Sequence, residues 1–325
     1  MRRRMNHRLF KRLQGKESDL MNEVVSFFST TIRLAAPTLL AALGIVFSER
    51  AGIVNIGTEG MMLVGALAGV IGSYVTGSAW LGMLIAVFVT VLFSAIFAYF
   101  TVVVKADQTV IGTGMNLLAS GLTITVNRAL FGASTSPPEI DSFGIVAIPG
   151  LSSIPIIGPI FFNHHIIVYL TFILVPIAQF VMFRTNIGLK VRSVGENPKA
   201  CDTVGIRVGL TRFLSILYSG VLAGMAGSFI SMGMVSFFTE GMIAGGGFIA
   251  LAAVVFGNYT PRGVMLSSLV FGASNSLMYR LQALATNIPS QFLLMIPYVI
   301  TIISLCIVSR KSNKPLGSGK PYIKE

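Results

Sequence analysis

The feature that most constrains the fold is a series of long apolar segments that recurs along the whole chain. These segments reach about 20 residues, the length that an α-helix needs to cross the hydrocarbon core of a bilayer. With 325 residues, 54% hydrophobic and 11% charged, and a mean hydropathy of +0.80, the chain is far more apolar than a soluble domain. The sequence therefore predicts an all-α, multi-pass membrane protein embedded in the lipid bilayer.

Nine segments are expected to form membrane-spanning helices. They are residues 32–47, 61–75, 81–104, 109–131, 166–183, 213–232, 243–256, 264–281 and 292–308. Residues 21–310 are thus the predicted transmembrane domain, and residues 311–325 are a tail. Residues 1–20 carry seven Lys or Arg, and we expect this basic leader to be disordered or to precede a true start at Met21.

A polar loop at residues 184–212 fixes the predicted orientation. Its six cations are Arg184, Lys190, Arg192, Lys199, Arg207 and Arg212. Placing them in the bilayer would cost upwards of roughly 15 kcal/mol, at about 2.5 kcal/mol each, so the loop is expected in the cytoplasm. When spans are counted along the chain in both directions from this loop, the segments predicted outside the cell contain no Lys or Arg, and the tail is predicted to be cytoplasmic. Only the leader disagrees; a start at Met21, a first span that does not cross, or an overlooked span would each resolve the conflict.

A short helix is predicted within this loop. Asn197 can cap it, Pro198 suits its first position, and Gly205 supplies a left-handed stop about two turns later. Its small apolar face would consist of Ala200, Cys201 and Val204. Such a helix is either an interfacial helix in an ordinary loop or a knob that docks into a partner.

Two glycine-rich segments interrupt the apolar chain, one in each half. Residues 48–60 contain Glu49, Asn55 and Glu59, and residues 237–247 contain Glu240. Irregular backbone near a membrane is tolerated where protein or a water-filled cavity covers it, and paired glycine-broken segments can mark a transport site. Alternatively, the glycines cap helices and permit close helix packing, as expected for the GxxxG pair Gly220 and Gly224.

Several polar residues fall within or at the ends of predicted spans. Asn116 lies in the middle of a span, where its amide needs a partner from another helix or from a polar solute. Arg33, Arg128 and Arg280 lie near outer helix ends, where long side chains commonly snorkel to water.

The chain lacks the motifs of several enzyme classes. It has no phosphate-binding P-loop, no HExxH and no GxSxG. The adjacent His164 and His165 on a predicted outer loop suit a metal poorly, Cys201 and Cys306 are expected to be free thiols, and the net charge of +12 fits an anionic membrane better than nucleic acid. We expect no enzymatic activity, no cofactor and no metal in this chain.

Three segments resemble the signature segments of bacterial ABC importer permeases for simple sugars and nucleosides. They read FSERAGIVNIGTEGMMLVGA at residues 47–66, GLKVRSVGENPKACDTVGI at residues 188–206, and GGGFIALAAVVFGNYTPRG at residues 245–263. The chain is most similar to the shorter of the two permeases in nucleoside importers. Branched-chain amino acid permeases share a looser version of the first segment.

The resemblance implies a type II importer-like fold in the bacterial cell membrane and a set of partners. The short helix would be a coupling helix seated in a separate ATPase with two nucleotide-binding modules, which binds ATP and Mg. The implied coupling residues are Glu196, Asn197, Pro198, Lys199, Ala200, Cys201, Val204 and Gly205. A longer second permease and an extracytoplasmic substrate-binding lipoprotein would complete the system.

For a neutral solute with hydroxyls and a base, we expect Asn55, Glu59 and Asn116 to supply hydrogen bonds. Phe47 and Phe237 would offer stacking faces, and Glu240 lies beside them in the predicted path. A branched-chain amino acid permease is the nearest alternative. An ion-coupled secondary transporter, which would relay protons through its few buried carboxylates, and a membrane-embedded enzyme remain open as other classes.

Overall fold

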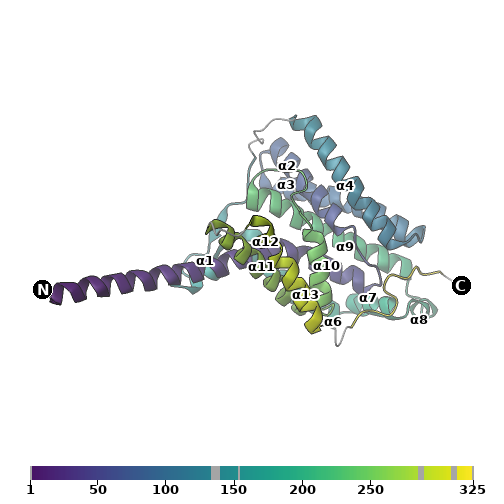
Figure 1. Cartoon of the computed structure of the whole chain (residues 1–325). Helices are drawn as coiled ribbons and strands as arrows, with labels where there is room; N and C mark the ends of the chain where they lie inside the picture. Colours follow the sequence, from purple (N-terminus) through teal and green to yellow (C-terminus); the bar gives the residue numbers. More distant parts are fainter. Residues whose placement is uncertain (1, 133–139, 153, 285–288, 309–312, 324–325) are drawn as a thin grey trace.

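The computed structural model describes every residue except 1, 133–139, 153, 285–288, 309–312 and 324–325. Its helices and strands, in chain order, are α1 (Arg2–Arg50), α2 (Thr58–Thr76), α3 (Ala79–Ala98), the π-helical η1 (Tyr99–Val103), α4 (Gln108–Phe131), β1 (Ile145–Ala147), α5 (Ile157–Phe161), β2 (Asn163–His165), α6 (Ile166–Arg184), α7 (Asn186–Glu196), α8 (Pro198–Thr203), α9 (Val208–Phe229), the π-helical η2 (Ile230–Val235), α10 (Gly246–Phe256), α11 (Pro261–Ala283), α12 (Ser290–Leu294) and α13 (Ile296–Val308). The predicted all-α class is confirmed (Figure 1).

Six helical stretches of the described chain are long and apolar enough to cross a membrane. They are Met21–Arg50, Thr58–Thr76, Ala79–Val103, Gln108–Phe131, Ile166–Arg184 and Val208–Val235. The multi-pass architecture is therefore confirmed, whereas the predicted number of nine is not. The remaining three predicted spans fall on α10, which has only 11 residues, on the serine-containing α11, and on the pair α12 and α13.

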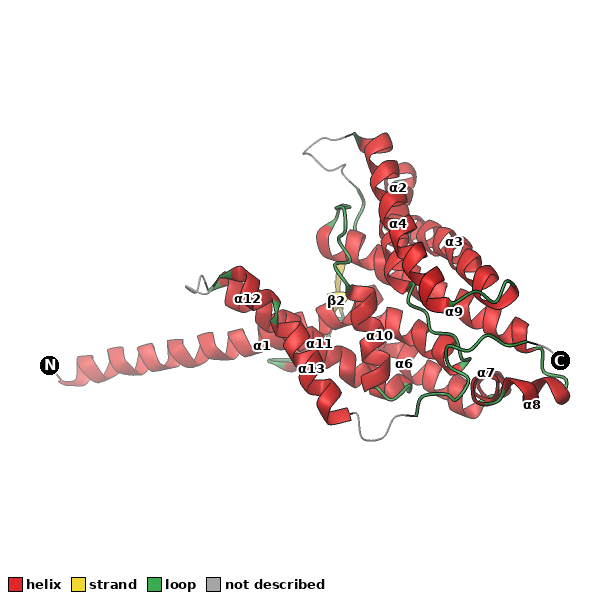
Figure 2. Ribbon diagram, turned by 45° about the vertical axis from the view of Figure 1, so that its right-hand side comes forward, coloured by secondary structure: helices red, strands yellow, loops and turns green. Residues whose placement is uncertain are grey.

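The basic leader differs from the expected disorder. It continues α1 from Arg2 as one helix, and the helix projects from the body of the molecule (Figures 1 and 2). Arg, Lys, Leu, Met, Gln and Glu dominate this stretch and all have good helix propensity, which explains why the helix does not stop at Met21.

The core is built where α1, α2, α3 and α9 pack on one another. Its largest fully buried side chains include Leu39, Leu43, Met61 and Phe229. Glycine permits the closest approach: a Cβ on Gly65 of α2 would lie 2.8 Å from the Gly224 Cα of α9, and one on Gly224 would lie 3.0 Å from the Thr90 Cβ of α3. The close packing predicted for Gly224 is confirmed.

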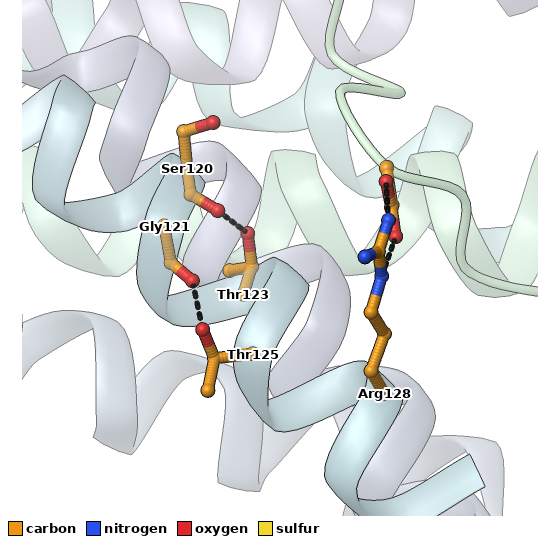
Figure 3. Close-up of polar contacts among 6 residues, drawn as sticks. Ser120, Gly121, Thr123, Thr125 and Arg128 are labelled. Carbon is orange, nitrogen blue, oxygen red and sulfur yellow. Dashed lines mark hydrogen bonds and ion pairs between the residues drawn. The ribbon is translucent and has the colours of Figure 1, made fainter. Parts of the chain in front are cut away.

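Helix α4 lies on the outside of the body and packs mainly on α2 (Figure 2). The Asp107 carboxylate caps it by accepting hydrogen bonds from the Thr109 and Val110 amides at 2.8 and 3.0 Å. Its threonine hydroxyls bond to the helix's own backbone, as Thr125 does to the Gly121 carbonyl at 2.8 Å (Figure 3). Because its exposed residues include Leu117 and Leu122, this face suits lipid or another apolar surface.

The predicted outer loop between α4 and α6 contains a small antiparallel hairpin. Strand β1 pairs with β2 so that Ile145 lies opposite His165. The His165 Nδ1–H donates to the Phe143 carbonyl at 2.8 Å, and the Trp80 ring meets the Phe143 ring edge-on with centroids 5.2 Å apart. The hairpin is thus fastened to the start of α3 through Phe143.

Candidate substrate path and coupling site

The turn between α1 and α2 holds Asn55, the first predicted substrate residue. The helix breaks at Gly52, whose φ of +89° is one that favours glycine. The fully buried Asn55 side chain donates from Nδ2 to the Ser219 Oγ of α9 at 3.0 Å. Its Oδ1 is buried and has no hydrogen-bond partner among the described residues. The Asn55 Nδ2 therefore joins the turn to α9, and the Asn55 Oδ1 is left as a candidate acceptor for a ligand.

Glu59 connects the two glycine-rich segments that the sequence singled out. It lies in the first turn of α2, and its carboxylate accepts hydrogen bonds from the Gly245 amide at 2.9 Å and the Gly247 amide at 2.6 Å. These amides open α10, so the carboxylate occupies the positive end of that helix. The two segments therefore meet at Glu59, and the transport site between them stays a prediction.

Asn116 bonds to protein, as expected for an amide at a helix interface. From α4 its Oδ1 accepts from the Gly60 amide at 2.8 Å and its Nδ2 donates to the Ile56 carbonyl at 3.1 Å. Asn116 thus holds both sides of the irregular segment that contains Glu59. Contact of Asn55, Glu59 or Asn116 with a substrate stays a prediction.

Glu240 lies away from this cluster, on the irregular segment before α10. It forms an ion pair with Arg128 of α4, with Arg128 Nε 2.8 Å from Glu240 Oε1 and Nη2 3.1 Å from Oε2. Figure 3 shows the guanidinium facing that carboxylate. Both side chains are exposed, and Phe237 nearby in the sequence is half-buried. Arg128 therefore has a specific acidic partner in addition to reaching the helix end.

Phe47 borders a hollow with a volume of about 930 Å³. Its ring packs against the Tyr218 ring with centroids 4.6 Å apart. The hollow is lined mainly by apolar residues of α6 and α9, and by Val204 and Arg207 after α8. Phe47 is the one predicted path residue among those that line this hollow.

The short helix predicted after Asn197 is present as α8, and its coupling role stays a prediction. Asn197 Oδ1 accepts from the Ala200 amide at 3.1 Å, Pro198 occupies the first helical position, and Gly205 has a φ of +82°. The predicted apolar face is divided, however. Ala200 and Val204 are exposed, whereas Cys201 is buried with Val194 and Val208. Cys201 therefore holds α8 to the chain, and burial raises the pKa of its thiol.

The remaining residues that are predicted to contact the ATPase differ in exposure. Glu196, Asn197, Lys199 and Gly205 are exposed and Pro198 is half-buried. No group of three His, Cys, Asp or Glu side chains in the described residues is placed to hold a metal ion. Burial lowers the pKa of both His164 and His165, and each ring is bonded to a backbone carbonyl.

Residues 27–305 match the protein family described as "Branched-chain amino acid transport system / permease component". Among known proteins, the chain is 39% identical to the guanosine ABC transporter permease protein NupQ of Bacillus subtilis, over 94% of this chain and 99% of NupQ. It is 38% identical to the nucleoside ABC transporter permease protein NupC of Lactococcus lactis, over 94% and 99% of the two chains. It is 35% identical to the putative glucose ABC transporter permease protein TsgC13 of Haloferax volcanii, over 82% and 80%. No solved structure matches.

The chain belongs to this permease family. The predicted resemblance to ABC importer permeases is confirmed, and the permease is a membrane-spanning component of a transport system rather than an enzyme. NupQ and NupC each match the chain over 94% of its length.

Sequence reasoning missed three buried groups that organise the permease around the α1–α2 turn. Arg50 Nε donates to the Tyr259 carbonyl at 2.8 Å, Arg212 Nε donates to the Ala51 carbonyl at 3.1 Å, and Gln108 Oε1 accepts from the Val54 amide at 2.8 Å. From the sequence, Arg212 indicated only that its loop is expected in the cytoplasm. The burial of Arg50 and Arg212, at 8% and 2% exposed, depends on long-range packing that a local pattern does not encode.

Proposed function

We propose that this permease forms the translocation path of an ABC importer for nucleosides in a bacterial cell membrane. The observation that carries the proposal is that the chain is 39% identical to NupQ and 38% identical to NupC over 94% of its length. The names of these two proteins specify guanosine and nucleosides. In this proposal a second, longer permease completes the path, an extracytoplasmic lipoprotein delivers the substrate, and the C-terminus of this chain lies in the cytoplasm.

The energy would come from a separate ATPase that binds ATP and Mg and grips α8. Two features support this arrangement: the Asn197 cap at the start of α8, and the exposure of Ala200 on α8 and of Val204 directly after it. Closure of the ATPase on nucleotide binding would pull the coupling helices together and expose the central path alternately to each side.

Within this chain, Asn55 supplies the best candidate for contact with a nucleoside, because its buried Oδ1 lacks a partner among the described residues. Asn116 and Glu59 would act on the same segment by holding its backbone. When the path opens, a base or sugar hydroxyl could satisfy the Asn55 oxygen, whose buried, unpaired state is otherwise unfavourable.

Uptake measurements test the proposal. Membrane vesicles that contain the permease pair, the ATPase and the binding protein are supplied with labelled guanosine, with ATP inside and a proton ionophore present. We expect ATP-dependent guanosine accumulation that survives the ionophore and is lost without the ATPase. Uptake that needs only the proton gradient would contradict the proposal and indicate a secondary transporter.

A sugar is the second candidate substrate, because TsgC13, named as a putative glucose permease, is 35% identical. Competition distinguishes the candidates: excess uridine or adenosine should displace labelled guanosine, whereas excess glucose or leucine should not. Displacement by leucine alone would favour the branched-chain amino acid alternative.

A further inference from the structure

The chain after α13 folds back onto the cytoplasmic end of the permease. We call residues 313–323 the C-terminal strap. Its Gly317 amide donates to the Gly195 carbonyl at 2.8 Å, and its Gly319 amide donates to the Gly52 carbonyl at 3.1 Å. The strap runs beside α7 and α8 in both views (Figures 1 and 2).

Side chains of the body fasten the strap at further points. Arg212 Nη1 donates to the Lys320 carbonyl at 3.0 Å, and the Asn313 amide donates to Asn258 Oδ1 at 2.7 Å. The same Arg212 also holds the Ala51 carbonyl at 3.1 Å. The strap therefore joins the end of α7, the turn after α1 and the start of α9, which are far apart in the sequence.

Glycines make this contact close. A Cβ on Gly317 would lie 2.7 Å from the Gly195 carbonyl oxygen, and one on Gly52 would lie 3.1 Å from the Gly317 carbonyl oxygen. Backbone packs directly against backbone at these points, so the strap fits the surface of the body closely.

The strap also completes the surroundings of α8. Tyr322 packs on the cluster of Val194, Cys201 and Val208 that holds the inner side of α8. Between residues 196–199 and the strap lies a hollow of about 550 Å³, which Lys320 and Ile323 help to line. The coupling helix and the strap thus present one continuous surface.

That surface carries apolar side chains with no cover in the described chain. On the strap, Leu316 is 76% exposed and Ile323 is 63% exposed; Val204, which follows α8 and borders the hollow beside α6 and α9, is 74% exposed. The strap lies beyond the last membrane helix and beside the basic coupling loop, where lipid tails cannot cover these groups. Exposed apolar residues with charged residues around them are typical of a protein contact.

We infer that the C-terminal strap is the second arm of the surface that receives the ATPase, a role that rests on the proposed function of α8. The occupant is the ATPase that grips α8, because the strap continues the surface of that helix without a break. The charged groups at the hollow are Lys199, Lys320 and the Glu196 carboxylate, so the matching part of the ATPase should carry charges of both signs beside an apolar cleft.

Co-purification tests the inference. The permease pair is expressed with an affinity-tagged ATPase, and the amount of permease retained by the tag is measured. The Ile323→Asp and Lys320→Glu double variant, which changes exposed side chains, should lower retention at least tenfold while the permeases still pair in the membrane. Arg262→Glu, a charge reversal outside the hollow, is the matched control and should leave retention unchanged.

A variant of the coupling helix itself separates the two hypotheses. If Val204→Asp abolishes retention and the strap variant does not, the inference is wrong and the proposed function stands. If neither variant lowers retention, both are wrong. A photo-crosslinking residue at position 323 of the assembled complex gives an independent readout: a product with the ATPase is expected, and products only with lipid or with the second permease would overturn the inference.

Discussion

At the scale of single residues, the polar groups of the predicted path serve first as a frame for the irregular backbone. Asn55, Glu59 and Asn116 come from a turn and two helices, and each bonds to a different neighbour. The sequence identified them because an amide or carboxylate in an apolar segment needs a partner. Which partner each one found could not be predicted, since it depends on how distant helices cross.

Asn116→Ala should loosen the segment that begins α2. The change leaves the Gly60 amide and the Ile56 carbonyl without their partner, which costs about 1–3 kcal/mol of folding free energy. We expect a lower thermal midpoint of the purified permease in detergent and reduced guanosine uptake. Asn127→Ala on the same helix is the control, and equal effects of the two variants would show that loss of any α4 amide is enough.

Glu59→Gln should weaken the junction of the two glycine-rich segments. One of the two backbone amides that the carboxylate binds would face an NH₂ group instead of an oxygen, and a hydrogen bond to a charged group contributes about 1.5–3 kcal/mol. Thermal unfolding and uptake measure the loss, with Glu23→Gln on the exposed part of α1 as the control. Full uptake by the Glu59 variant would exclude a role for this junction in transport.

At the scale of elements, α8 was predictable almost to the residue, and its setting was not. The cap, the first-turn proline and the stopping glycine are local signals, and all three act as expected. Cys201 turns inward onto Val194 and Val208, which flank α8 in the sequence, and Tyr322 of the strap, more than a hundred positions away, packs on the same cluster. The same limit explains the hairpin β1–β2, whose three-residue strands are too short to show alternation.

Asn197→Ala should fray the start of α8, because the cap bond to the Ala200 amide is lost, at a cost of about 1 kcal/mol. We expect a several-fold lower affinity for the ATPase and a proportionate fall in uptake. Asn197→Asp retains an oxygen acceptor and should behave as the original protein. If the aspartate variant fails as the alanine variant does, the side chain acts by contact with the partner and not as a cap.

The hairpin should open as the pH falls. Burial lowers the pKa of His164 and His165 below the ordinary value of 6.5, Arg33 lowers both further, and His165 also lowers the pKa of His164. The folded hairpin disfavours a charged imidazole. The hairpin is therefore fully stable above the unfolded histidine pKa, and it loses stability as the pH falls below that pKa toward the lower pKa of the folded state.

Trp80, the single tryptophan of the chain, contacts Phe143 and reports this change. We expect its fluorescence to shift between about pH 7 and 5, since histidine titrates in this range. The His165→Asn variant keeps a donor for the Phe143 carbonyl but does not titrate, and it should show a smaller shift. An unchanged shift in a His164→Gln and His165→Asn double variant would assign the response to another group.

At the scale of the whole molecule, the packing of α2, α3 and α9 depends on the absence of side chains at their crossing. Gly224→Ala would drive a methyl group toward Thr90 of α3, and the backbone of α2 leaves no room to retreat. We expect a destabilisation of about 1–3 kcal/mol, typical of overpacking, seen as a lower thermal midpoint. Gly121→Ala on α4, where nothing lies within 4 Å, is the matched control. Equal midpoints would show that the helices can move apart freely.

The number of membrane crossings shows how far composition alone can predict the molecule. Apolar runs located a helix at each of the nine predicted places, but α10 is short and the segment after residue 289 is divided into two helices. The length of each helix depends on where the neighbouring glycine-rich segment begins and ends. Those boundaries follow from contacts such as that of Glu59 with α10.

The position of the strap in the chain has a consequence for biogenesis. Because it follows every membrane helix of the described chain, the ribosome delivers it only after those helices have left the exit tunnel. If the strap is the second arm of the surface that receives the ATPase, a prematurely terminated polypeptide would present α8 without that arm. Full binding of the ATPase would then require synthesis to pass the strap, which would disfavour the powering of incomplete pores.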